Sequence, residues 1–211
     1  MEETVRIAVG DITLDGRVAA PADATAGIVV CHPHPQYGGS MENDLVVALT
    51  EALRGAGFAT VRFDFRGVGA SGGRYDDGRG EVDDVRAAAE MLRSRLDVSK
   101  VGLVGYSFGS VMALRAAVVE PDATAGVVAI APPVRMLGLD FLAGSGVPLA
   151  FVTGDRDQFC PLATLESARE RFAPGSTLGL VPGADHFFGG HLDALARRVV
   201  ELAQTVANSS A

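Results

Sequence analysis

Short, continuous apolar segments alternate with segments of helical periodicity along most of this chain, and this alternation constrains the fold more than any other feature. The apolar runs are GIVVC (27–31), FATVRFD (58–64), VGLVGY (101–106), GVVAIAP (126–132), VPLAFVTG (147–154) and STLGLVP (176–182). Strands that are apolar at successive positions are typical of a parallel sheet covered on both faces. The pattern therefore predicts an α/β fold in which helices flank both faces of a mostly parallel sheet.

The intervening segments show the spacing of amphipathic or buried helices. We expect helices over about 45–56, 82–96, 110–119, 162–172 and 192–206. Residues 4–9 and 12–20 alternate around Gly-Asp, which indicates an N-terminal hairpin. The length of 211 residues favours a single domain over 1–211. In parallel sheets, sites form at the carboxyl ends of the strands, so we looked for reactive residues in the loops that follow them.

Composition excludes several classes of partner. Lys and Arg total 18 and Asp and Glu total 26, for a formal net charge of −8. Such a chain lacks the basic face that nucleic acids or anionic lipids require, so we expect no nucleic-acid or membrane partner. The opening MEETVRIAVG has no apolar signal core, and no apolar run approaches about 18 residues, which predicts a cytoplasmic protein with reduced thiols. The composition leaves the oligomeric state open.

The sharpest local motif is Gly105-Tyr106-Ser107-Phe108-Gly109, which ends an apolar run and precedes a helical segment. A tight strand-to-helix turn needs glycines where a Cβ would clash, and it holds the serine in a strained conformation. The helix N-terminus favours the negative charge that develops during acyl transfer. A plain glycine-rich turn with serine as the helix cap is the alternative. We predict that Ser107 is a nucleophile.

A serine hydroxyl needs a base to become nucleophilic at neutral pH. His186 lies in the glycine-rich segment GADHFFGG, after the last predicted strand, where an imidazole reaches over the sheet edge. His191 stands at the start of the last helix and is expected to cap it or to face solvent. We therefore choose His186 as the base.

The acid that orients His186 is sought in GDRDQFCP, which follows the run at 147–154. We choose Asp157, because the later position should lie further over the edge, and we assign Asp155 to the turn itself. Asp185 is a weaker candidate, since adjacent side chains tend to diverge. The order Ser107, Asp157, His186 is the chain order of nucleophile, acid and histidine in α/β-hydrolases.

Two backbone N–H groups should stabilise an oxyanion. One is that of Phe108, the residue after the nucleophile. The other should come from HPHPQYGGSMEN after the run at 27–31. The prolines of this segment have no N–H, which leaves His34 as the best-placed donor and Gln36 or Tyr37 as alternatives.

Two rival motifs are weaker. His32-x-His34 resembles a metal-ligand pair, but a metallohydrolase needs further ligands, and His32 is expected to fix the loop instead. Residues 67–72 read G-x-G-x-x-G, yet the sequence continues as GRYDDGRG rather than as the helix that a dinucleotide site requires. Cys31 and Cys160 are too far apart for a C-x-x-C motif. We predict no metal and no cofactor.

Apolar and aromatic residues fall in the same loops. Those expected to contact a small-molecule substrate are Tyr37, Phe65, Met136, Phe159 and Phe187. Each alone is more often a core residue, but together they allow an apolar pocket. The arginines Arg66, Arg135 and Arg156 are expected to be solvated, although each could recognise an anionic group. Whether Cys160 lines the pocket is left open.

The segments HPHPQYGGSMEN, RFDFRGVGASGG, GYSFGS and GADHFF together resemble the α/β-hydrolase superfamily, in particular its small bacterial lidless branch. The resemblance covers about residues 4–205. It implies an eight-stranded, mostly parallel sheet and a Ser107–His186–Asp157 triad. Members with larger substrates often carry a cap domain after the sixth strand, but only about fourteen residues (133–146) are available here. Dienelactone-type relatives use a cysteine nucleophile, so the serine disfavours that activity.

The sequence thus predicts a cofactor-independent serine hydrolase that cleaves a small or exposed carboxylic ester through an acyl-enzyme. An acyltransferase, a thioesterase or a cyclising enzyme would use the same three residues. A non-catalytic binding protein of this fold would be indicated by the loss of a triad residue, and all three residue types are present.

Overall fold

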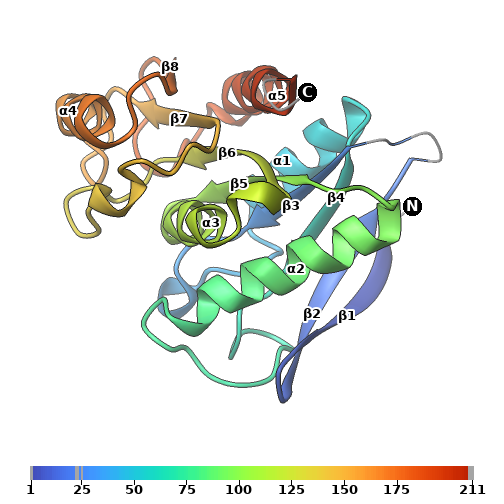
Figure 1. Ribbon diagram of the computed structural model, residues 1–211. Coiled ribbons are helices and arrows are strands. Elements are labelled where there is room, and N and C mark those ends of the chain that lie inside the picture. The colour runs from blue at the N-terminus through green and yellow to red at the C-terminus, as the bar shows by residue number, and fades with distance from the viewer. Residues whose placement is uncertain (1, 22–23, 25, 209–211) are drawn as a thin grey trace.

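The computed structural model describes residues 2–21, 24 and 26–208, in which eight strands form one twisted sheet (Figure 1). The strands are β1 (Glu3–Val9), β2 (Ile12–Ala19), β3 (Gly27–Cys31), β4 (Ala59–Phe63), β5 (Val101–Tyr106), β6 (Thr124–Ile130), β7 (Leu149–Gly154) and β8 (Thr177–Val181). Their order in the sheet is β1-β2-β4-β3-β5-β6-β7-β8. The β1–β2 and β2–β4 pairs are antiparallel and the others are parallel, which confirms the predicted mostly parallel sheet.

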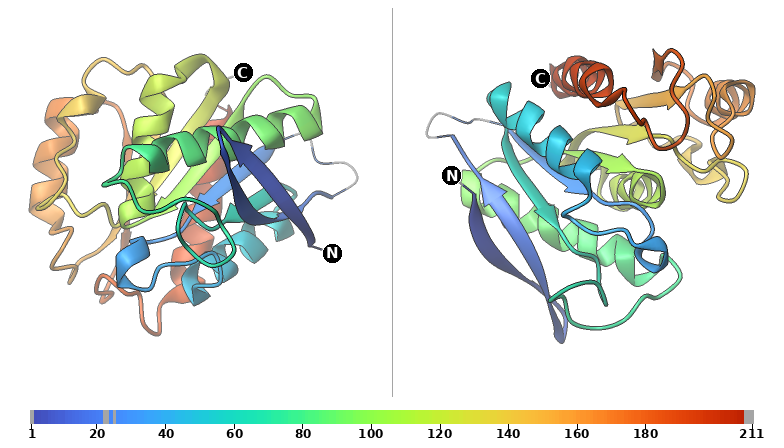
Figure 2. Two further views of the ribbon diagram at one scale, coloured as in Figure 1. Left: turned by 90° about the horizontal axis from the view of Figure 1, so that it is seen from below. Right: turned by 180° about the vertical axis from the view of Figure 1, so that it is seen from behind.

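Five α-helices cover the two faces of the sheet in the described residues. They are α1 (Asp44–Gly55), α2 (Gly80–Leu96), α3 (Phe108–Val119), α4 (Leu162–Phe172) and α5 (Leu192–Asn208). Helices α1 and α5 pack on one face, and α2 and α3 pack on the other (Figures 1 and 2). No helix in the described ranges is both long and apolar enough to span a membrane.

The link from β6 to β7 contains one short 3-10 turn, η3 (Asp140–Leu142), and no cap domain. Two further 3-10 turns are η1 (Pro35–Tyr37), after β3, and η2 (Pro121–Ala123), before β6. The carboxyl ends of the parallel strands are therefore left open to solvent, apart from their own loops.

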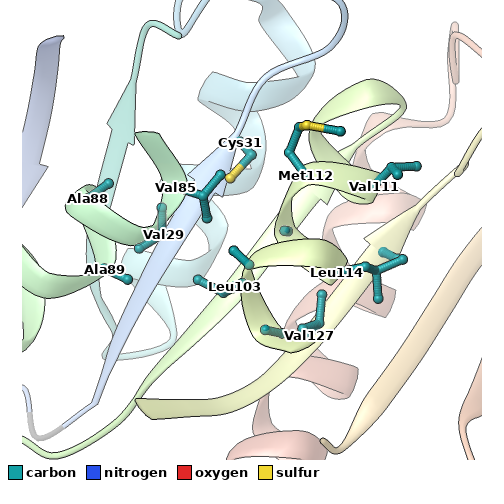
Figure 3. Packing of buried hydrophobic residues seen from close by; sticks show 14 of the residues in the cluster. Val29, Cys31, Val85, Ala88, Ala89, Leu103, Val111, Met112, Leu114 and Val127 are labelled. Atoms are coloured by element: carbon teal, nitrogen blue, oxygen red, sulfur yellow. The ribbon is translucent and has the colours of Figure 1, made fainter. Parts of the chain in front are cut away.

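Successive residues of the central strands enter two separate hydrophobic cores, which explains why those strands are apolar throughout. On β3, Val29 and Cys31 belong to the core under α2 and α3, whereas Ile28 and Val30 belong to the core under α1 and α5. Figure 3 shows the first core, where Val29 and Cys31 lie near Val85 of α2. The burial of both faces fixes the register of the parallel strands and so the positions of their carboxyl ends.

Helices α2 and α3 begin at Gly80 and Phe108, each two residues before its predicted start at 82 or 110. In α3, Gly109 belongs to the helix and not to the turn before it. A Cβ at Gly109 would collide with the carbonyl oxygens of Cys31 and His32 at the end of β3. A Cβ at Gly105 would likewise meet the backbone of Gly109. The two glycines thus let the backbone of α3 approach β3 and β5 directly.

We expect Gly109→Ala to lower the free energy of unfolding by about 1–3 kcal/mol or more, because the colliding atoms are backbone and move aside only at a cost. Gly55→Ala is the matched control, since Gly55 ends α1 and a Cβ there meets no atom within 4 Å. That control should be neutral or gain about 0.4–1 kcal/mol. Urea unfolding followed by circular dichroism measures both, and equal midpoints for the two variants would contradict the packing argument.

Candidate active site

Ser107 occupies the turn between β5 and α3 in a conformation that few non-glycine residues adopt. Its φ is 54° and its ψ is −118°. The Ser107 N–H donates to the carbonyl of Ile130 at the end of β6, at 2.8 Å. The serine is therefore held by the neighbouring strand as well as by its own helix, and its strained backbone is stabilised by the surrounding fold.

His186 reaches Ser107 from the loop between β8 and α5. The Nε2 atom of His186 lies 3.0 Å from the Ser107 Oγ. The hydroxyl of Tyr106 donates to the carbonyl of His186, at 3.0 Å, and so ties this loop to the end of β5. The rings of Phe159 and Phe187 stand edge-on to the imidazole, with centroids 4.8 and 5.6 Å away. The ring is thus oriented by packing against two aromatic side chains.

Asp157 completes a continuous series of hydrogen bonds. Its Oδ2 lies 2.9 Å from the Nδ1 of His186. Its Oδ1 accepts the backbone N–H groups of Phe159 and Cys160, each at 2.8 Å. Because an ionised carboxylate only accepts hydrogen bonds, Nδ1 carries the imidazole proton and Nε2 is free to accept one from Ser107.

The alternative acids and the other histidine are used elsewhere. Asp155 accepts the N–H of Gly183 at 2.7 Å and so joins the loops after β7 and β8, as expected for a turn residue. Asp185 is exposed and accepts the N–H of Phe187 at 3.0 Å. His191 precedes α5, and its Nδ1 lies 2.8 Å from the carbonyl of Gly189. The structure brings none of these three side chains to Ser107.

The loop after β3 borders the same cavity as His186 and carries the predicted backbone donors. The N–H of Gln36 donates to the Nδ1 of His34, at 3.2 Å, and the N–H of Tyr37 donates to the carbonyl of His34, at 3.1 Å. Both alternative oxyanion donors are therefore already engaged. Within the described residues, the N–H groups of His34 and Phe108 have no acceptor, and both residues line the same cavity as Ser107.

His32 fixes this loop through hydrogen bonds from its ring to backbone atoms. Its Nδ1 lies 2.6 Å from the carbonyl of Pro33, and its Nε2 accepts the N–H of Phe65, at 3.0 Å. Burial lowers the pKa of His32 to about 4, so the ring is neutral at physiological pH. With both nitrogens bonded to backbone, His32 joins the ends of β3 and β4 and has no nitrogen left to ligate a metal.

A cavity of about 560 Å³ opens above Ser107 and is lined by the loops that follow the strands from β3 to β8. Of the five side chains predicted to contact substrate, four line it: Tyr37, Met136, Phe159 and Phe187. Phe65 does not, which corrects that expectation. It is completely buried beside β4, where its ring lies 4.7 Å from that of His32 and 5.7 Å from that of Phe108. The chain thus still belongs to the core two residues after β4 has ended.

The cysteine and the three arginines that the sequence left as candidates do not line the cavity. The Cys160 side chain is buried outside the cavity, and burial raises the pKa of its thiol to about 12. Arg66 was expected to be solvated, but it is largely buried and paired with Asp84, with its closest contact at 2.7 Å, which corrects that expectation. Arg135 and Arg156 are exposed and lie away from the cavity.

Sequence reasoning missed Arg115, which lines the cavity from α3. It stands seven residues after Phe108 and three after Met112, so all three share one helix face. This periodicity was available in the sequence, but α3 is apolar on almost every side, and nothing marked the face that borders the cavity.

Comparison with known proteins places this arrangement in a family. A model described as the alpha/beta hydrolase fold matches residues 28–156. An uncharacterised protein of Rickettsia prowazekii is 32% identical over 185 residues, which are 83% of this chain and 77% of that protein.

Two solved structures are similar over nearly the whole chain. An alpha-beta serine hydrolase homologue from Coxiella burnetii is 32% identical, with a TM-score of 0.86 over 94% of this chain and 96% of that one. A serine hydrolase without lid from Xanthomonas campestris is 32% identical, with a TM-score of 0.85 over 97% and 94%. The chain therefore belongs to the alpha/beta hydrolase fold family.

Proposed function

We propose that this protein is a serine hydrolase that cleaves a small or exposed carboxylic ester through an acyl-enzyme and needs no cofactor. The observation that carries the proposal is the hydrogen-bonded series from the Ser107 hydroxyl through His186 to Asp157, at 3.0 and 2.9 Å. These distances are those of a nucleophile, its general base and the acid that orients the base.

In the first half of the reaction, the Ser107 Oγ attacks the ester carbonyl while the Nε2 of His186 takes its proton. The Asp157 carboxylate stabilises the imidazolium that forms. The N–H groups of Phe108 and His34 donate to the developing oxyanion. The Nε2 proton then passes to the leaving alcohol as the C–O bond breaks, which leaves Ser107 acylated.

In the second half, water replaces the alcohol. His186 removes a proton from the water as its oxygen attacks the acyl carbon, and it returns that proton to the Ser107 Oγ when the acid leaves. The open carboxyl edge of the sheet supports access for water and for a small substrate. A cavity of about 560 Å³ lined by aromatic side chains fits such a ligand. The similar structures described as a serine hydrolase homologue and as a serine hydrolase without lid also support this reaction class.

Labelling with a fluorophosphonate tests whether Ser107 is activated. We expect one covalent adduct on the intact protein, measured by mass spectrometry, because a phosphonylated serine requires a base within reach. The folded Ser107→Ala variant should show no adduct, and its kcat/KM for p-nitrophenyl acetate should fall by a factor on the order of 10³–10⁶. Ser110→Ala is the control, since the Ser110 hydroxyl is buried and donates to the carbonyl of Ser107. An adduct that persists in Ser107→Ala would refute the assignment.

The assignment of the acid predicts a difference between two neighbouring aspartates. Asp157→Asn should lower kcat by a factor on the order of 10²–10⁴, because an amide does not stabilise the imidazolium and favours the wrong tautomer. Asp185→Asn, next to His186 in sequence, should stay within about threefold of wild type, because Asp185 only caps its own exposed turn. Steady-state kinetics on both folded variants measures kcat. Equal losses of kcat in the two variants would refute the assignment of Asp157 as the acid that orients His186.

A further inference from the structure

Arg115 and His186 both line the cavity above Ser107, Arg115 from α3 and His186 from the loop after β8. Helix α3 carries Ser107 at its N-terminal cap, and Phe108, Met112 and Arg115 follow on the face that lines the cavity. At 1.5 Å per residue, the rise from Phe108 to Arg115 is about 10 Å. Helical side chains lean toward the N-terminus, so the Arg115 side chain lies over the turn that carries Met112, and its guanidinium stacks on Phe141.

The Arg115 guanidinium has no acidic partner in the part of the chain that the structure describes. It stacks on the ring of Phe141, 5.4 Å from its centroid, and makes no hydrogen bond or ion pair there. Asp77 also borders the cavity, but its carboxylate is exposed and lies 3.9 Å from Arg79. Of the lysine and arginine side chains, Arg115 alone lines this cavity among the described residues. A half-buried cation, oriented by an aromatic ring and left with five free donors, is suited to an anionic ligand.

The position of His186 decides which part of an ester lies near Arg115. The leaving alcohol must stay within reach of the Nε2 of His186, and it therefore lies beside Phe159 and Phe187. The acyl chain then extends in the other direction, over the rings and thioether of Phe108 and Met112. Arg115 also lines a second hollow, with Val118, Phe141 and the exposed Asp140, so a chain end bound at Arg115 keeps contact with water.

We propose that the substrate is an ester of a linear dicarboxylic acid, in which the free carboxylate at the far end of the acyl chain binds Arg115. The planar guanidinium matches a carboxylate with two parallel hydrogen bonds. The apolar surface of Phe108 and Met112 fits the intervening methylene groups. This inference rests on the proposed role of Ser107 and adds a specificity-determining residue to it.

Hydrolysis of paired substrates tests the charge preference. The p-nitrophenyl hemiesters of glutaric, adipic and suberic acid are compared with their ω-carboxamide analogues, which have the same shape and no charge. Wild type should favour one or more of the carboxylates, and Arg115→Met should lower kcat/KM for them by about 10- to 100-fold, the value of a charge-assisted hydrogen bond. The kcat/KM for the carboxamides should fall by a smaller factor, because a neutral amide forms no ion pair with the guanidinium. Arg115→Lys should keep part of the preference, because it keeps the charge and loses the fork.

Arg197→Met is the matched control, because Arg197 is exposed on α5, which covers the other face of the sheet. It removes the same charge from the protein as Arg115→Met does and should leave the preference intact. Equal rates for carboxylate and carboxamide with wild type would overturn the role of Arg115 while the ester hydrolysis itself stands. A preference lost equally in Arg197→Met would also overturn it, since only net charge would then matter.

Calorimetry separates this inference from the proposed reaction. Monomethyl adipate and monomethyl suberate are titrated into Ser107→Ala and into the double variant that also carries Arg115→Met. Binding to the first that weakens at least tenfold in the second supports the anion site, even if no ester is turned over by wild type. Equal affinity of the two proteins for the monoesters overturns the anion site. Absence of turnover and of fluorophosphonate labelling in wild type counts only against the role of Ser107.

Discussion

The direct backbone contact between α3 and the end of β3 is the constraint on which the site depends. Gly109 contacts the carbonyls of Cys31 and His32, and Gly105 contacts the backbone of Gly109. No side chain separates the helix from the strands at these two positions. Backbone atoms held by a sheet move little, and the Ser107 Oγ is therefore fixed relative to the sheet. The strain at Ser107, with φ at 54°, is tolerated because the burial of α3 on both sides offsets it. The nucleophile is thus positioned by the core, and its partners are brought to it by loops.

Those loops hold their places through buried hydrogen bonds to their own or neighbouring backbone. His32 joins the ends of β3 and β4, Tyr106 holds the carbonyl of His186, and one oxygen of Asp157 is saturated by two N–H groups. Polar groups buried in this way are costly to leave unpaired, so each loop has one favoured arrangement. The loop after β3 is fixed in addition by Asp64, which accepts the N–H of Met41 at 2.7 Å. A site with a large open cavity therefore still has a rigid set of reacting atoms, and it needs no cap domain to order them.

The sequence was sufficient for the sheet and helices because burial on two faces produces patterns that span many residues. The starts of α2 and α3 were each predicted two residues late. At α3 the reason is Gly109, which the sequence indicates as a turn residue, although its lack of a side chain serves the contact with β3. The choice of Asp157 over Asp155 followed from position along the strand, and the structure places Asp157 beside His186 and Asp155 in the turn. Phe65 shows the limit of such reasoning: an aromatic residue at a strand end faces the cavity or the core according to contacts with segments far away in the chain. The choice of oxyanion donor in the loop after β3 was limited in the same way. It depends on which N–H groups form hydrogen bonds within the loop, and those of Gln36 and Tyr37 do.

Helix α3 links the chemistry to the proposed specificity. Its N-terminal turn carries Ser107 and the Phe108 N–H, and its third turn carries Arg115, so one rigid element sets the distance between the reacting carbonyl and the bound carboxylate. A helix does not stretch, and acyl chains that are too short or too long lose either the ion pair or the attack geometry. The formal charge of −8 weakens long-range attraction of an anion, so its binding depends on the short-range contact with the guanidinium. Selection by acyl length is therefore a consequence of helix geometry, whereas selection by charge depends on a single side chain.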